Sequence, residues 1–101
     1  MPRKKPTSNA ITILHRRYVG DDPRRQASLQ AERFSAEIAS LIHRRRTEAG
    51  LSQAQLARMI GTTQSVISRL EDADYRGHSL RMLARIAAAL NQRLTVSMAA
   101  G

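Results

Sequence analysis

One stretch, Leu51–Glu71, constrains the fold of this chain more than any other. Ser52 is a typical helix N-cap, and Gln55 stands three residues later, at the spacing of a capping box. Gly61 can adopt the left-handed backbone conformation that ends many helices, because it has no Cβ atom. Thr63 can then cap a second helix. The stretch therefore predicts two short helices joined by a tight turn at Gly61.

Each of the two predicted helices has an apolar face and a polar face. Apolar residues recur at helical spacing on the inner faces, at Leu56, Ala57, Ile60, Ile67 and Leu70. The outer face of the second helix carries side chains that can form hydrogen bonds, at Gln64, Ser65, Ser68 and Arg69. A second helix that packs on the first and presents such a face outward is typical of a DNA-reading helix-turn-helix.

Composition supports a small domain with a polyanionic partner. The chain has 101 residues, of which 42% are apolar and only three are aromatic, so its core must be aliphatic. The net charge of +9, from 17 Lys and Arg against 8 Asp and Glu, favours nucleic acid, although charge alone also fits a membrane surface or an acidic protein. The scarcity of aromatic residues argues against recognition of single strands by base stacking. We therefore expect double-stranded DNA as the partner.

The sequence offers no pattern for catalysis, metal binding or cofactor binding. It has no cysteine, which excludes disulfides and thiolate zinc sites. None of the three histidines, His15, His43 and His78, stands at metal-ligand spacing, and we interpret all three as surface residues, with a phosphate contact as the alternative for His78. The acidic residues between 71 and 74 lack the spacing and glycine of a calcium loop. We predict a protein that is not an enzyme and needs no cofactor.

The sequence also gives expectations about location. No segment approaches the roughly 18 apolar residues needed to span a membrane. The basic start of the chain is not followed by the long apolar run of a secretory signal. We therefore expect a cytoplasmic protein without a membrane partner.

Residues 1–22 form the first predicted region, a basic N-terminal tail followed by an apolar island. The tail, residues 1–10, fits a solvated terminus or a nonspecific contact with DNA phosphates. The island, residues 11–19, has apolar spacings that fit either a helix or a strand. It is too short to bury its apolar surface alone, so it must pack within the molecule or its dimer, or on another protein.

Residues 23–92 form the predicted DNA-binding domain, with the reading helix at about 63–72. Asp22 as N-cap and Pro23 at the first helical position mark the start of an extended first helix. A helical period continues to Ala49, as one helix or as two helices joined near residues 31–34, and Gly50 supplies a stop. The last predicted helix is capped by Ser79 and ends near Asn91, with an inner face at Leu80, Leu83, Ile86, Ala87 and Leu90.

Residues 93–101 form a predicted dimerisation strand. Leu94, Val96 and Met98 alternate with hydroxylated residues, the period of a half-buried strand. A lone strand leaves its backbone groups unpaired, and the same strand of a second copy can pair with it across a two-fold axis. The expected fold is thus an all-α helix-turn-helix bundle with an extended first helix and a short C-terminal β-strand that pairs across a dimer.

Residues 38–90 resemble the helix-turn-helix domain shared by lambdoid phage repressors, Cro proteins and regulators of the xenobiotic-response-element (XRE) class. The matching positions include Ile42, Arg46, the run from Gly50 to Gln53, Leu56, Ala57, Gly61, Gln64, Ile67, Ser68, Leu70, Glu71, Ser79, Leu80, Ile86, Ala87, Ala89 and Leu90. This resemblance implies an internal salt bridge between Arg46 and Glu71, which would tie the first helix to the end of the reading helix.

The same resemblance implies roles for residues that face DNA. Gln64, Ser65 and Arg69 would meet base edges, since Gln suits adenine and Arg suits guanine. Val66 would either meet a thymine methyl group or pack at the helix edge. Phosphate contacts are expected from Gln53, Thr63, Arg76, Arg44 and Arg45, although a merely solvated arginine is the alternative for Arg76.

The small size and the ending of the chain are similar to HigA-type antitoxins, and the ending also resembles the paired tail of the HipB antitoxin. The resemblance implies a bacterial homodimer that neutralises an RNA-cleaving HigB/RelE-like toxin and represses its own operon. We place toxin binding in the N-terminal extension, at Ile11, Ile13, Leu14, Tyr18 and Leu29. The alternatives are a phage or plasmid repressor without a toxin, and an interaction adaptor that has lost DNA binding.

Overall fold

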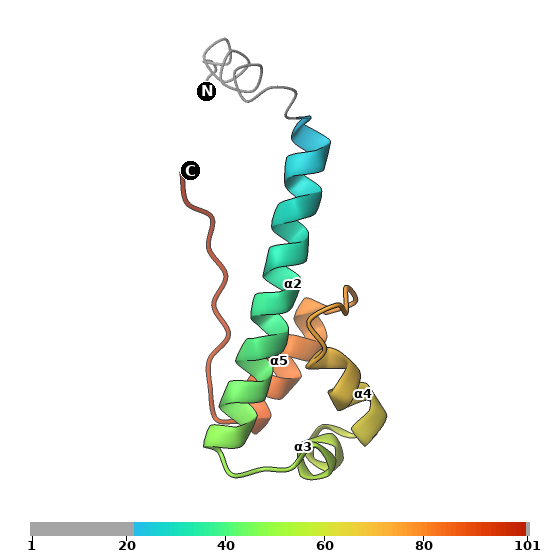
Figure 1. The fold of residues 1–101 in the computed structure, drawn as a ribbon. Helices are drawn as coiled ribbons and strands as arrows, with labels where there is room; N and C mark the ends of the chain where they lie inside the picture. Colours follow the sequence, from blue (N-terminus) through green and yellow to red (C-terminus); the bar gives the residue numbers. More distant parts are fainter. Residues whose placement is uncertain (1–21, 101) are drawn as a thin grey trace. The chain divides into compact units, whose positions relative to one another are not determined.

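The computed structural model describes residues 22–100 and shows four helices over that range (Figure 1). They are α2 (Pro23–Glu48), α3 (Gln53–Ile60), α4 (Gln64–Leu70) and α5 (Leu80–Ala89). The predicted all-α class is confirmed for this part of the chain. The chain divides between Glu32 and Arg33 into two units, and the helix-turn-helix belongs wholly to the second. Four residues of the predicted toxin-binding set, Ile11, Ile13, Leu14 and Tyr18, lie outside the described range.

The first helix is a single element from Pro23 to Glu48, so the alternative of two helices is excluded. Its start follows the predicted signal, because the Asp22 carboxylate accepts a hydrogen bond of 2.9 Å from the Arg24 amide. Its end is followed by Gly50, which has a φ of 74° and turns the chain toward α3. In the second unit, α2 contributes the buried side chains of Ala39 and Ile42.

The turn between α3 and α4 forms as the sequence predicts. Ser52 accepts from the Gln55 amide, and the Gln55 side chain accepts from the Ser52 amide, which completes the capping box. Gly61 ends α3 in the left-handed conformation, at φ 73° and ψ 39°. The Thr63 hydroxyl accepts from the Val66 amide and caps α4. These local bonds set where α4 begins.

The core of the second unit lies where α3, α4 and α5 gather around the C-terminal half of α2 (Figure 1). Leu56 in α3 and Ile67 in α4 are fully buried at its centre. The other buried members of the cluster are Ile42, Ala57, Ile60, Leu70, Ile86 and Leu90. This aliphatic core holds the two helices of the turn against their neighbours, because each apolar side chain it buries favours the folded state by ~1.5–3 kcal/mol.

Helix α5 has the predicted caps but a different inner face. Ser79 accepts from the Met82 amide, and Asn91 follows the helix with a φ of 59°. Leu80, which we expected on the inner face, is 64% exposed, and Met82 packs against the core instead. At 3.6 residues per turn, Leu80 lies roughly 120° around the helix from Ile86. The expectation for Leu80 was therefore wrong for a geometric reason.

Residues 92–100 follow α5 without a helix or strand in the described single chain. The strand expected over residues 93–101 needs a second copy to pair with, so strand pairing stays a prediction. Within residues 22–100, no helix is long and apolar enough to cross a membrane.

Candidate DNA-binding surface

The exposed face of α4 carries the residues expected to read bases. Gln64, Ser65 and Arg69 are exposed, and Thr63 precedes them at the cap. Val66 is half-buried and packs against the core, which agrees with the edge-packing alternative for this residue. The face that remains accessible is therefore polar, and its two ends are a glutamine and an arginine.

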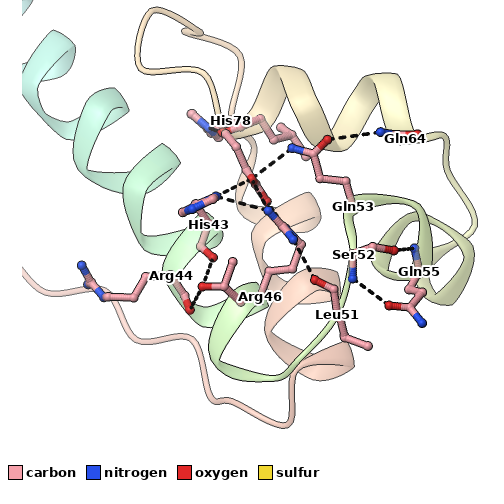
Figure 2. Close-up of polar contacts among 12 residues, drawn as sticks. His43, Arg44, Arg46, Leu51, Ser52, Gln53, Gln55, Gln64 and His78 are labelled. Carbon is pink, nitrogen blue, oxygen red and sulfur yellow. Dashed lines mark hydrogen bonds and ion pairs between the residues drawn. The ribbon is translucent and has the colours of Figure 1, made fainter.

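A buried ion pair fixes the C-terminal end of this reading helix to α2. The Arg46 Nε atom donates to Glu71 Oε2 over 2.6 Å, and its Nη2 atom donates to Oε1 over 3.0 Å (Figure 2). The Arg46 side chain is 9% exposed and that of Glu71 is 5% exposed. Arg46 also donates to the Leu51 carbonyl over 2.7 Å, which ties the start of the turn to the same group. The structure thus places Arg46 and Glu71 in the arrangement that the resemblance implies.

Glu71 accepts from two further side chains. His43 in α2 places Nδ1 at 3.0 Å from Oε1, and Gln53 in α3 donates its amide to the same oxygen over 3.2 Å (Figure 2). One carboxylate at the end of α4 is therefore bonded to side chains from both preceding helices. Because Glu71 is also the C-cap of α4, this cluster restricts rotation of α4 relative to α2 and α3.

The Glu71 cluster favours the ionised carboxylate. Burial by itself would raise the pKa of Glu71, but hydrogen bonds from Arg46, His43 and Gln53 outweigh it and hold the pKa below its ordinary value. The hydrogen bond to Glu71 also raises the pKa of the Arg46 guanidinium. The pair is thus charged at neutral pH and its members satisfy one another.

The network continues from Glu71 to the face of α4 that is expected to read bases. The Gln64 amide nitrogen lies 3.5 Å from Gln53 Oε1, at the long end of hydrogen-bond distance. A carboxylate can only accept, so Gln53 must turn its NH₂ group toward Glu71 and its oxygen toward Gln64. Gln64 must then turn its own NH₂ group toward Gln53. Its carbonyl oxygen and one N–H remain available, which is the pair of groups that recognises adenine.

The three arginines that are expected to contact phosphates fall into two groups. Arg44 is exposed and forms no ion pair among residues 22–100, and Arg76 lies in the loop after α4, where it donates to the Asp74 carbonyl over 3.4 Å. Arg45, by contrast, is paired with Glu48 over 3.0 Å and lines a pocket next to α5. The structure does not bring Arg45 to the reading helix.

Two histidines have structural contacts that the sequence analysis missed. His78 is half-buried, and its Nε2 atom lies 2.7 Å from the Leu70 carbonyl, so it must donate there and cap the end of α4. Its ring meets Tyr75 edge-on at 5.1 Å between centroids. The expectation of an ordinary surface residue was wrong for His78. His43 is exposed but belongs to the Glu71 cluster. Its position three residues before Arg46, on the same helical face, is the sequence feature that could have indicated this contact.

The carboxylates of the loop after α4 do not form a metal site. Asp72 accepts from the Asp74 amide over 2.8 Å, so its carboxylate is used within the loop itself. Among the described residues, no group of three or more His, Asp and Glu side chains is arranged to hold a metal ion.

The fold and this surface define a helix-turn-helix protein with a polar reading helix. A family model described as Helix-turn-helix matches residues 42–96, more than half of the chain. The chain therefore belongs to the helix-turn-helix family of the lambda-repressor-like, XRE type, whose domain is a DNA-binding regulatory unit and not an enzyme. Comparison with curated proteins returned no match, and comparison with solved structures also returned none.

Proposed function

We propose that the protein is a sequence-specific transcriptional repressor that binds a palindromic operator as a homodimer. The observation that carries this proposal is the hydrogen-bonded chain from Glu71 through Gln53 to Gln64. A reading residue whose amide orientation is set in advance loses less conformational freedom on binding and discriminates better between bases. Gln64 reads adenine, and Arg69, five residues further along α4, reads guanine.

Phosphate contacts complete the proposed surface. Gln53 stands at the first position of α3, where free backbone amides and the helix dipole attract a phosphate. Thr63 at the start of α4, Arg44 near the end of α2, and Arg76 after α4 add donors around the reading helix. With a net charge of +9, such a surface releases several counterions on binding, so affinity falls steeply with salt.

Selection from random DNA duplexes tests this function directly. We expect a palindrome whose half-sites lie one helical turn apart, roughly 34 Å, with an adenine that loses its selection in Gln64→Ala. Gln30→Ala is the matched control, because Gln30 is an exposed glutamine of α2 outside the second unit. Failure to select any motif, or an unchanged motif with Gln64→Ala, would contradict the proposal.

The finer proposal is that the repressor is also the antitoxin of a HigB/RelE-like ribonuclease. Residues 22–34 are all exposed, and they include Leu29 at 48% exposure. An exposed helical segment with a large apolar side chain is suited to a protein partner. This segment belongs to the N-terminal extension in which we place toxin binding, with Ile11, Ile13, Leu14 and Tyr18.

Co-expression tests the antitoxin proposal. A small basic ribonuclease-like product of a neighbouring gene should arrest growth alone, be neutralised by this protein, and co-purify with it. Removal of residues 1–32 should abolish co-purification and leave operator binding in place. Growth arrest that this protein does not relieve would favour a phage or plasmid repressor. A full chain that neither relieves the arrest nor binds an operator would favour an interaction adaptor.

A further inference from the structure

A pocket opens in the second unit between the C-terminal half of α2, α5 and the chain that follows α5. Its volume is about 190 Å³, and its apolar lining includes Leu41, Ile86, Leu90 and Leu94. Arg45 and Arg93 also contribute to the lining. The pocket is on a part of the unit that the Glu71 cluster and the reading helix do not use. It is large enough to accept an apolar side chain.

The tail carries apolar side chains that stay partly or wholly exposed in the described part of the chain. Leu94 is 37% exposed, Val96 is 70% exposed and Met98 is 99% exposed. In an extended segment, alternate residues share a face, so these three side chains form one apolar row. From residue 93 to residue 100, no backbone amide donates to another described backbone carbonyl. Both the row and the backbone beside it need a partner.

We propose that Met98 of the partner subunit fills this pocket in a homodimer whose tails pair antiparallel about Val96. This inference rests on the proposed dimer and adds its register and the contents of the pocket. In a two-fold pairing, Val96 then faces its own copy, and Leu94 faces Met98 of the partner subunit. Directly opposed residues have Cβ atoms about 4.5–5.5 Å apart. Because Leu94 lines the pocket, Met98 of the partner subunit, which lies opposite Leu94, is placed beside the pocket.

The row of apolar side chains selects this register over its neighbours. A shift of the two-fold axis to Thr95 pairs Leu94 with Val96 and leaves Met98 without an apolar partner. A shift to Ser97 pairs Val96 with Met98 and places Leu94 opposite Ala100, which offers only a methyl group. The register centred on Val96 pairs each of the three large apolar side chains with another of the three, so it buries the most apolar area, and that area decides between registers of equal backbone pairing.

A second copy is a better occupant than the chain's own tail. Met98 is four residues beyond Leu94, which is about 13 Å in an extended chain, so it is carried away from the pocket that Leu94 lines. Its exposure of 99% agrees with this. Methionine is also suited to an irregular pocket, because its unbranched side chain adapts to the available shape.

Disulfide cross-linking of the full-length protein tests the register without interference, because the natural chain has no cysteine. Oxidised Val96→Cys should become a covalent dimer. Leu94→Cys and Met98→Cys should each stay uncrosslinked alone, because each residue is about 13 Å from its own copy. An equal mixture of those two variants should give the cross-linked heterodimer. Cross-linking of Leu94→Cys alone, or none in the mixture, would overturn the register.

Sedimentation measurements test the pocket itself. Met98→Lys should raise the dimer dissociation constant by at least about tenfold, because it puts a positive charge into a pocket lined by apolar side chains and by Arg45 and Arg93 in both subunits. Met98→Leu and the control Met59→Lys, on an exposed methionine of α3, should leave the constant within about twofold. A stable dimer that is insensitive to Met98→Lys would overturn the pocket inference alone. A wild-type chain that is monomeric at every concentration would overturn the dimer as well.

Discussion

The guanidinium of Arg46 lies 2.6 Å from the carboxylate of Glu71, so a residue of α2 holds the C-cap of the reading helix. The same carboxylate accepts from Gln53, which in turn contacts Gln64. One buried carboxylate therefore links the packing of α2 and α4 to the face of α4 that we propose reads bases.

Breaking the ion pair from one side should be costly. Arg46→Met leaves the Glu71 carboxylate buried without its main partner, and we expect a loss of about 3–5 kcal/mol in the free energy of unfolding. The double variant Arg46→Met/Glu71→Leu should recover most of that loss, since it leaves no unpaired charge. Urea unfolding measures all of these variants. A double variant no more stable than Arg46→Met would contradict this account.

Stability should fall at acid pH because of Glu71. Its pKa in the folded state lies below its ordinary value of 4.5, so the folded state binds this proton less readily than the unfolded state. The contribution is present above pH 4.5 and is lost as pH falls through the folded-state pKa. Urea midpoints from pH 7 down to pH 3 should decline less steeply in Glu71→Gln. Equal slopes would show that other carboxylates cause the decline.

The core assignment can be tested with two leucines. Leu56→Ala should cost about 2–5 kcal/mol, because Leu56 is fully buried between the helices of the turn. Leu80→Ala removes the same atoms from an exposed position and should change the free energy of unfolding by no more than about 0.5 kcal/mol. Thermal or urea unfolding measures both. Similar losses in the two variants would contradict the observed packing of α5.

The turn depends on the conformation of Gly61. A Cβ atom there would meet only the Arg85 guanidinium, at 3.7 Å, so there is room for a side chain. The φ of 73° is nevertheless unfavourable for alanine, and Gly61→Ala should cost about 1–2 kcal/mol. Gly61→Asn should cost less, because asparagine tolerates this conformation better. An alanine variant as stable as the wild type would show that the turn can relax.

The Gln53–Gln64 contact should matter for specificity more than for affinity alone. Gln53→Ala frees the Gln64 amide to rotate, so the preference for adenine over guanine at its base should shrink. Gln64→Ala should remove a preference worth about 1–3 kcal/mol. Arg44→Ala is the control, since loss of a phosphate contact weakens all sequences alike and lowers the salt slope by about 1. An unchanged preference for adenine in Gln53→Ala would show that Gln53 does not orient Gln64 for base reading.

The comparison of prediction and structure shows which signals are local. Ser52, Gln55, Gly61 and Thr63 act on backbone groups within a few residues, and all of them have the predicted contacts or backbone angles. Leu80 was misplaced because an apolar residue in the first turn fits a helical period loosely. The contacts of His78 with the Leu70 carbonyl and Tyr75 carry no signal in sequence spacing, because residues 71–79 form no helix or strand whose period would set them.

The sequence by itself determined the helices, their caps and the turn between α3 and α4, because those features depend on hydrogen bonds and backbone angles within a few residues. The family pattern also indicated that Arg46 and Glu71 would meet. Only the tertiary structure decided that His43, Arg46 and Gln53 all converge on one carboxylate, and that Gln53 extends this network to Gln64. Residues between 11 and 28 positions apart are brought together by the packing of three helices, and that packing follows from the shape of the whole core.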